Sequence, residues 1–336
     1  MSIEIEEIGR DEYGTWDSYV EQSPNSNLFH QSKALELQSE FSGAELHALV
    51  GYKGQEPVGL FPLFEMEKGP FTAVFSPPPK LWIPRQGPAL LNMQKLKRRK
   101  QERRLKRFID GCVEWLDENV DHDYAEIRTA GDYHDARPFK WNGSEVTPEY
   151  TYVVDLTVGE DDLLGQFSSD ARSNIRNTDE DSYTVEEGTV EDVDRILEQV
   201  RDRYEAQGKA FNMVRGFGRS LYEALPEGQI RPYVCRSDGE YLTGILAFEY
   251  DGRTHRWQGG VKPDFDVDIP TNDLLDWHIM SDAMDRGLDQ YDLVGAGNPR
   301  LNEYKSKFGP ELELFYDIEH GSRPATVLVD LYRRFA

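Results

Sequence analysis

YDLVGAGNPRLNEYKSKFGPELELFYDIE, residues 291–319, is the stretch that decides the fold, because it predicts a strand, a short helix and a second strand. Asn298 is a suitable N-cap, since its side chain can accept hydrogen bonds from the free amides of a first turn. Pro299 occupies a helix position that needs no amide partner. Gly309 supplies the left-handed stop, and Pro310 prevents the helix from continuing. The helix is therefore only about two and a half turns long.

Polar side chains are concentrated on this short helix. Leu301, Lys305 and Phe308 share one side of it, and Tyr304 and Lys307 are neighbours at a spacing of three. Packing alone would not require a tyrosine and two lysines here. The pattern therefore indicates a site for chemistry.

The order YDL–G–N–xxx–YKxKFG in this stretch closely resembles the end of the second domain of the Fem family of aminoacyltransferases. It also resembles the BioF2-like acyltransferases, their relatives in the GNAT superfamily. The segments that agree with this resemblance are 27–37, 124–129, 168–188, 241–261 and 269–293. The resemblance implies an α/β (α+β) fold of two tandem GNAT-like domains with mixed central sheets. It also implies an enzyme that moves an acyl or aminoacyl group to an amine, with acyl-CoA or aminoacyl-tRNA as co-substrate and no tightly bound cofactor.

Length and the order of predicted elements also favour two α/β domains. The chain has 336 residues, more than one hydrophobic core usually serves. Both halves run through helices and a hairpin to a helix and a strand. We predict an N-terminal domain at 1–150 and a C-terminal domain at 151–336 that carries the active site. The turn-rich stretch 131–150 is predicted to link them, and 94–119 to form one long helix.

Composition points to a salt-adapted protein. The formal charge is −24, although 38% of residues are hydrophobic, and the chain has 13 Lys against 25 Arg. Enough apolar residues are present for folded cores, so the acidity belongs to the surface. We expect a haloarchaeal-type cytoplasmic protein, with no signal peptide, no transmembrane segment and two buried thiols, Cys112 and Cys235.

The resemblance assigns catalytic roles to two neighbouring residues. It places Lys305 near the point of acyl transfer, where a cationic donor can stabilise an oxyanion by roughly 3–4 kcal/mol. It makes Tyr304 the general acid for the leaving group. The alternative is a core tyrosine beside solvated lysines. Only four lysines occur in 141–336, however, and two of them lie on this helix.

An acceptor cleft is expected beside this helix. Arg172 and Arg176 stand four residues apart on one predicted helix face, and guanidinium groups suit carboxylates and phosphates. An ordinary surface ion-pair stripe remains the alternative. The complete set of predicted substrate-binding residues is Arg172, Arg176, Asn298, Lys307, Phe308, Trp257 and Gln258.

The donor is expected at the predicted central strand. The resemblance implies that this strand separates from the next one and exposes main-chain groups to the donor's arm. Gly259 and Gly260 permit a bulge and close backbone approach, and Asn272 completes the predicted cofactor-binding set. An ordinary strand end is the alternative reading.

The loop that follows departs from the acetyl-CoA pattern. KPDFDVDIPTNDLL, 262–275, is acidic and glycine-free where a pyrophosphate would need free amides. We therefore expect a carrier other than acetyl-CoA. Asp264, Asp266 and Asp268 lack the glycine and glutamate of an EF-hand, and we predict no metal site.

Nine of the thirteen residues in KLKRRKQERRLKR, 95–107, are basic. Such a cluster is a candidate phosphate-binding surface. We predict contact with tRNA there, and a basic face paired with acidic neighbours is the alternative. The residues are Lys95, Lys97, Arg98, Arg99, Lys100, Arg103 and Arg104.

Three functions follow in order of preference. The first is an acyltransferase or aminoacyltransferase that acts by direct attack, without a covalent enzyme intermediate, on an amine of a cell-envelope or metabolite acceptor. The second is a non-catalytic RNA- or phosphate-binding protein that uses 95–107. The third is an ordinary acetyl-CoA-dependent N-acetyltransferase, which the acidic loop disfavours.

Overall fold

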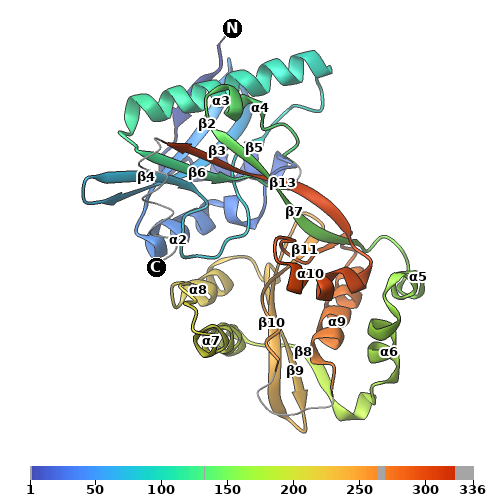
Figure 1. The fold of residues 1–336 in the computed structure, drawn as a ribbon. Coiled ribbons are helices and arrows are strands. Elements are labelled where there is room, and N and C mark those ends of the chain that lie inside the picture. Colours follow the sequence, from blue (N-terminus) through green and yellow to red (C-terminus); the bar gives the residue numbers. More distant parts are fainter. Residues whose placement is uncertain (1, 132, 263–268, 322–336) are drawn as a thin grey trace. The chain divides into compact units, whose positions relative to one another are not determined.

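The computed structural model describes residues 2–131, 133–262 and 269–321, and the chain divides into two units (Figure 1). The first unit comprises Met1–Glu149 and the C-terminal strand from Leu314, and the second is Tyr150–Glu313. The last strand therefore belongs to the first unit, whereas the sequence prediction places all of 151–336 in the second domain.

The first unit contains a mixed sheet of six strands in the order β1-β2-β3-β4-β6-β13. Only β4 and β6 run parallel, and the other neighbouring pairs are antiparallel. The strands are β1 (Glu4–Glu7), β2 (Glu45–Lys53), β3 (Glu56–Lys68), β4 (Phe71–Ser76), β6 (Tyr124–Arg128) and β13 (Glu311–Gly321), and the two-residue β5 (Ala89–Leu90) pairs with β3. The helices are α1 (Tyr13–Gln22), α2 (Ser32–Ser42), α3 (Arg98–Asn119) and α4 (Arg137–Trp141).

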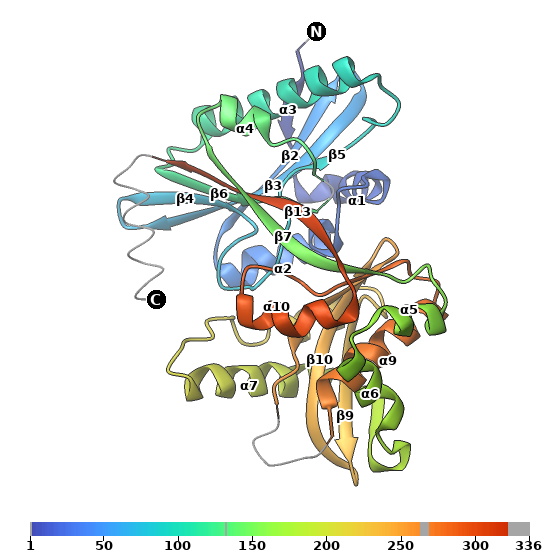
Figure 2. The same ribbon diagram turned by 45° about the vertical axis from the view of Figure 1, so that its right-hand side comes forward.

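The long helix α3 covers one face of this sheet, and α1 and α2 cover the other (Figures 1 and 2). Its buried stripe contains Leu105, Phe108, Ile109, Cys112 and Leu116, at the spacing of one helix face. Gly51 and Gly59 allow this packing, because a Cβ at either would lie 2.5 or 2.6 Å from the Phe108 ring.

The structure corrects two sequence predictions in this unit. The helix predicted at 94–119 begins only at Arg98. The stretch predicted to be a turn-rich link, 131–150, contains α4 and the first part of β7 (Glu145–Asp155). The proline and polar residues of EVTPEYTYVVD obscure the alternation that would indicate a strand there.

The sheet of the second unit is also mixed, with its strands in the order β7-β12-β11-β10-β9-β8. β11 and β12 are parallel, and the other pairs are antiparallel. The remaining strands are β8 (Thr184–Glu187), β9 (Ile230–Ser237), β10 (Glu240–Tyr250), β11 (Arg253–Gly259) and β12 (Gln290–Asp292). The helices are α5 (Glu160–Gln166), α6 (Ser169–Asn177), α7 (Val190–Ala206), α8 (Phe217–Ala224), α9 (Thr271–Asp285) and α10 (Pro299–Lys305).

Helices cover both faces of this second sheet as well. α7 and α8 lie on one face, and α9, with α5 and α6 beside it, lies on the other (Figure 1). α9 buries residues on every side, including Leu275, Ile279 and Met280. Two charged residues, Asp273 and Asp276, are buried on the same helix, and they belong to the candidate site.

Both cysteines are buried, as the sequence predicts. Burial raises the pKa of the Cys235 thiol to about 11 and that of Cys112 further. In the part of the chain that the structure describes, no helix has the length and apolar character that a bilayer crossing requires.

Candidate active site

The short helix α10 is capped as its sequence predicts. The Asn298 side chain accepts a hydrogen bond from the Arg300 amide at 3.1 Å, and Pro299 opens the helix. The helix ends at Lys305 and tightens into a 3₁₀ turn over Ser306–Phe308. Gly309 stops it with a φ of 68°. Asn298 therefore acts as a cap in this structure, and its side-chain oxygen is used by the backbone.

Lys305 is buried and holds the loop between β12 and α10. Its Nζ donates hydrogen bonds to the carbonyls of Val294 and Gly295, both at 2.8 Å. The loop needs such support because Val294, a β-branched residue, has a left-handed φ of 52°. Burial, reinforced by the charge of Arg256, lowers the pKa of Lys305 to about 8. With two of its three hydrogens engaged, Lys305 retains one donor for a substrate.

Tyr304 is part of a buried network around Asp276 of α9. Its hydroxyl donates to Asp276 Oδ2 at 2.5 Å. Asp276 Oδ1 accepts from the hydroxyl of Tyr291 at 2.5 Å and from Arg256 Nε at 2.9 Å. Asp276 itself has no exposed surface. Burial and then the Asp276 charge raise the pKa of Tyr304 well above its usual value, so the phenol is protonated at neutral pH.

Lys307 and Phe308 are also occupied by protein contacts. Lys307 Nζ lies 2.6 and 2.7 Å from the two carboxylate oxygens of Asp273. It also lies 4.6 Å from the centre of the Tyr304 ring. Phe308 is fully buried and packs edge-on against Tyr304. Both residues thus position the network, whereas the sequence analysis places them at the substrate.

The central strand separates from its neighbour beside this network. β11 pairs with β12 only at Arg253–His255, opposite Gln290–Asp292, and then continues alone on that side to Gly259. Arg256, the first residue after the separation, reaches Asp276, and Lys305 binds the loop that follows β12. The separation therefore brings main-chain groups, a guanidinium, a phenol and an ammonium to one place.

Gly259 and Gly260 make a close backbone contact at the end of β11. Gly259 has a φ of 107°, and a Cβ there would lie 2.2 Å from the Gly244 carbonyl oxygen. The Gly260 amide donates to that same carbonyl at 2.8 Å. Trp257 is buried against Phe217, and its neighbour Gln258 is half-buried. No side chain larger than hydrogen fits at Gly259, so the predicted close approach is between two strands of the protein.

The described start of α9 does not suit a pyrophosphate. Pro270 at the N-cap has no amide, and the first turn contains the buried carboxylate of Asp273. Asn272 donates to the Gly260 carbonyl at 3.0 Å, so it ties the turn to β11. An anionic ligand would meet Asp273 at this helix start, which opposes the helix dipole that usually favours phosphate. Residues 263–268, which include Asp264, Asp266 and Asp268, lie outside the described residues, so the prediction of no metal site there stays a prediction.

The two arginines predicted for the acceptor differ in environment. Arg172 Nη1 donates to the carbonyls of Gly165 at 3.1 Å and Phe167 at 2.5 Å, and so closes the end of α5. Arg176 is exposed one turn later on α6. The structure therefore gives Arg172 a structural contact and leaves Arg176 at the surface.

A hollow of about 530 Å³ lies between α7, α8 and the segment before α8, and the sequence analysis did not anticipate it. Its walls combine apolar and charged side chains, among them Leu197, Phe211, Met213, Arg215 and Arg219. Arg215 pairs with Glu198, and Arg219 pairs with Asp194. No polar motif marks this region in the sequence, because its residues come from separate helices and an irregular segment.

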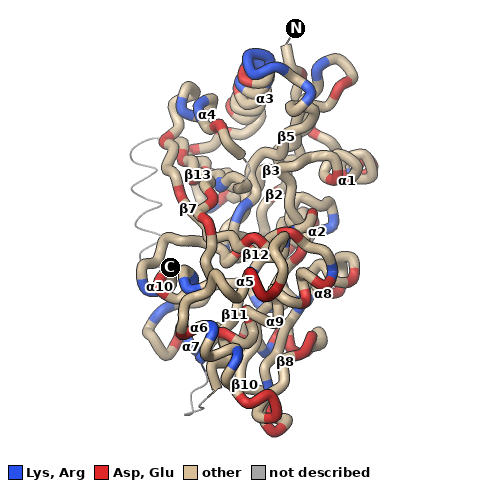
Figure 3. Tube along the Cα trace, turned by 90° about the vertical axis from the view of Figure 1, so that its right-hand side faces the viewer, with Lys and Arg blue, Asp and Glu red and all other residues tan. Residues whose placement is uncertain are grey.

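The basic stretch 95–107 forms the end of a loop and the start of α3, and it is the blue region at the beginning of that helix in Figure 3. Arg104 is buried and forms a bidentate pair with Glu56, at 2.9 and 3.0 Å. Arg98 pairs with Glu102, and Lys95 donates to Asn92. Lys97, Arg99, Lys100 and Arg103 are exposed.

The sequence analysis missed the carboxylates that organise the site. Asp276 stands in the apolar stripe of α9, one turn before Met280, so a charge at a core position was the available signal. Asp292 is equally buried and accepts from the Thr151 hydroxyl at 2.6 Å. It lies 3.3 Å from His255 Nδ1. No cluster of metal-ligating side chains occurs within 2–131, 133–262 and 269–321.

Residues 165–306 match the family model described as acetyltransferase (GNAT) domain. This match covers α6 to α10 and the strand separation described above. No curated protein matches the chain in sequence.

Solved structures resemble the whole chain in fold. The crystal structure of FemX has a TM-score of 0.70 at 16% identity, covering 93% of this chain and 96% of that one. The C-terminal domain of a putative lysylphosphatidylglycerol synthetase from Agrobacterium fabrum has a TM-score of 0.57 at 13% identity, covering 96% of both chains. A tandem GNAT protein from the clavulanic acid biosynthesis pathway has a TM-score of 0.50 at 12% identity, covering 94% of this chain and 97% of that one. The predicted fold of two GNAT-like domains with mixed sheets is confirmed, and so is the class of enzyme, an N-acyltransferase.

Proposed function

We propose that this N-acyltransferase, whose second unit contains a GNAT acetyltransferase domain, transfers an acyl or aminoacyl group from a carrier directly to an amine. The observation that carries the proposal is the separation of β11 from β12 beside Arg256, Tyr304 and Lys305. Beyond its pairing with β12, β11 is the strand that we assign to the arm of a donor, and we place the attacked carbonyl beside these three side chains. FemX, and a synthetase whose name denotes an aminoacylated lipid, support aminoacyl transfer as the reaction.

The reaction we propose is a direct displacement. The acceptor nitrogen bonds to the donor carbonyl carbon, and the amine loses its proton to solvent. The remaining N–H of Lys305 stabilises the tetrahedral oxyanion, an interaction worth roughly 3–4 kcal/mol in a dry site. When the bond to the carrier breaks, the Tyr304 phenol turns from Asp276 to the leaving atom, donates its proton and recovers one from solvent. Asp276 and Arg256 position that phenol, so no covalent enzyme intermediate is required.

We favour a donor carrier that places no pyrophosphate at the N-terminal end of α9. Asp273 in the first turn of α9, paired with Lys307, supports an aminoacyl-tRNA or another carrier over acetyl-CoA. Acyl-CoA is the competing donor, and the match of 165–306 to an acetyltransferase (GNAT) domain favours it. Within the second unit, we place the acceptor at the surface formed by Arg176 and the edge of α6. An amine on a cell-envelope precursor or a metabolite is the proposed acceptor class.

The proposal is tested by assaying the purified protein in high salt with acetyl-CoA, longer acyl-CoAs and charged tRNA. Product on a panel of amines would be detected by mass spectrometry. We expect N-acylated product from one donor class, and a loss of turnover in both Lys305→Ala and Tyr304→Phe. Lys209→Ala changes an exposed lysine of the same unit and serves as the matched control. Full activity in both site variants would refute the assigned roles, and the absence of product with every donor would refute the function.

We further propose a salt-adapted archaeal cytoplasm as the setting. The supporting observation is the acidic, lysine-poor composition, with a charge of −24. At 1 M salt the Debye length is about 3 Å, so the surface carboxylates would repel one another only weakly. The unfolding temperature should rise as KCl is raised into the molar range. An unfolding temperature that is highest in dilute buffer would contradict this assignment.

A further inference from the structure

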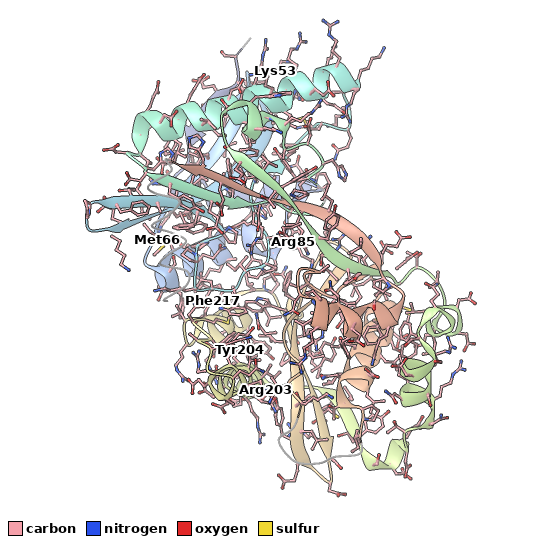
Figure 4. The ribbon with its side chains drawn as sticks, viewed as in Figure 1. Lys53, Met66, Arg85, Arg203, Tyr204 and Phe217 are labelled. Carbon is pink, nitrogen blue, oxygen red and sulfur yellow. The ribbon has the colours of Figure 1, made fainter. Side chains whose placement is uncertain are left out.

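A cationic hollow lies in the first unit, where the end of β2 meets the first turns of α3. Its volume is about 210 Å³, and five cationic side chains line it: Lys53, Lys100, Arg103, Arg104 and Arg107. Figure 4 shows Lys53 beside α3. A water molecule occupies about 30 Å³ in the liquid, so the hollow has room for a group of several heavy atoms.

The four residues from α3 point the same way for a simple reason. Positions 100, 103, 104 and 107 follow the spacing of one helix face, so their side chains converge. Arg99 stands on the same turn, but it does not line the hollow. The basic residues of 95–107 are therefore divided between a converging set and a set directed elsewhere.

Positive charge in the hollow exceeds the negative charge that neutralises it. Arg104 is buried and is neutralised by its bidentate pair with Glu56. Lys53, Lys100 and Arg103 form no ion pair with any carboxylate among the described residues. In a chain with 62 acidic side chains, three converging cations without such a partner are unusual.

The cations at the start of α3 also oppose the helix dipole. The first turn of α3 contains no acidic residue, and it begins with Arg98, Arg99 and Lys100 after Lys97 at the N-cap. The N-terminal end of a helix carries partial positive charge and favours anions. Cations at this end are repelled by the helix and by one another. A bound anion would reverse both effects.

We propose that this hollow is a binding site for an oligophosphate group, such as a free di- or triphosphate or the polyphosphate of a nucleotide. Arginine forks and lysine ammonium groups are the donors that bind phosphate oxygens, and the converging cations match the charge of several phosphate oxygens. Arg104, held by Glu56, forms the fixed wall, and Lys53, Lys100 and Arg103 supply the donors. Acyl transfer plays no part in this inference, which therefore stands or fails separately from the proposed function.

Inorganic triphosphate is the probe for the test, with affinity measured by calorimetry on the full chain. Arg103→Ala and Lys100→Ala should each weaken binding by about tenfold, because each removes a charge-assisted hydrogen bond. Arg99→Ala removes the same charge from the same turn of α3 outside the hollow, and it should change affinity less than about twofold. Unfolding temperatures of the unliganded variants verify that each one is folded.

Two results would overturn the proposal. Equal weakening by Arg99→Ala and Arg103→Ala would mean that triphosphate responds to the general field of the helix and not to the hollow. Binding of an RNA duplex that triphosphate does not displace, and that Arg99→Ala weakens as much as Arg103→Ala, would identify an extended nucleic-acid surface in place of this site. Displacement of any bound RNA by triphosphate, with Arg103→Ala alone weakening both, supports the proposal.

Discussion

The hydroxyl of Tyr304 on α10 donates to Asp276 on α9 across 2.5 Å, and Asp276 is a fully buried carboxylate. This contact joins the two helices that flank the separation of β11 from β12. It also fixes the orientation of the phenol that we propose as the general acid. Asp276 also accepts hydrogen bonds from Tyr291 and Arg256, so a single carboxylate orients three side chains.

Asp276→Asn should destabilise the fold strongly. The substitution leaves the buried guanidinium of Arg256 without its counter-charge, and breaking a buried pair in this way costs about 3–5 kcal/mol. Urea unfolding measures the loss. Asp285→Asn makes the same chemical change at an exposed position of α9 and should alter stability by less than about 0.5 kcal/mol. Similar unfolding free energies for the two variants would mean that the Asp276 network does not stabilise the fold.

Lys305 should give the protein a pH-dependent stability in the alkaline range. Its pKa falls from 10.5 to about 8 on folding, because burial disfavours the charged form. The unfolded state therefore binds more protons between about pH 8 and 10.5, and the free energy of unfolding rises across that window. The full penalty, about 3 kcal/mol, is present below pH 8. Lys305→Met should lack this rise when unfolding is followed from pH 7 to 10.5, and an unchanged profile in the variant would contradict the assignment.

The catalytic rate should also depend on the protonation of Lys305, but it should fall, not rise, as the pH increases. If protonated Lys305 stabilises the oxyanion, kcat should fall as the pH rises through about 8. Lys305→Arg keeps its charge over the whole range and should remove this inflection, whatever its absolute rate. A decline in kcat that persists in Lys305→Arg would assign the titration to another group.

The turn after β12 should tolerate glycine better than valine. Val294 has a φ of 52°, a conformation that costs a β-branched residue of order 1–3 kcal/mol. Val294→Gly should therefore raise the unfolding free energy by about 1 kcal/mol, or leave it unchanged where lost packing offsets the relief. Gly295→Ala, at a φ of 85° with open space around its Cβ, should lower it by about 1 kcal/mol through backbone strain alone. If Val294→Gly destabilises the protein more than Gly295→Ala does, the proposed backbone strain at Val294 is refuted.

Gly259→Ala should disrupt the end of β11. Its Cβ would lie 2.2 Å from a backbone oxygen, and its φ of 107° is strained for alanine. Gly287→Ala shares a positive φ of 77° but meets nothing within 4 Å, so it isolates the cost of backbone conformation. Thermal unfolding should show Gly259→Ala as the more destabilised of the two by at least about 2 kcal/mol. Equal losses of stability in the two variants would mean that the β10 and β11 backbones can move apart at Gly259.

Elements with a clear period or clear end signals were predictable from the sequence. The Asn298 and Gly309 caps predicted for α10 are both confirmed. β4 carries no such signal, because Phe71–Ser76 is short and precedes a proline-rich passage. The site was only partly predictable, since Lys305 and Tyr304 carry a motif, whereas Asp276 acquires its meaning only when α9 packs against α10. Sequence spacing cannot reveal that Arg172 turns back to cap α5.

The assignment of the last strand to the first unit has a consequence for how the protein is made. β13 pairs with β6 from Asp317 to Gly321, and Ile318 is buried in the core of the first unit. During synthesis, β6 remains an open sheet edge until all of the second unit has left the ribosome, and open edges invite pairing with other chains. A fragment that stops at residue 150 would keep that exposed edge permanently. The first unit is thus the earlier to be translated but the later to be completed.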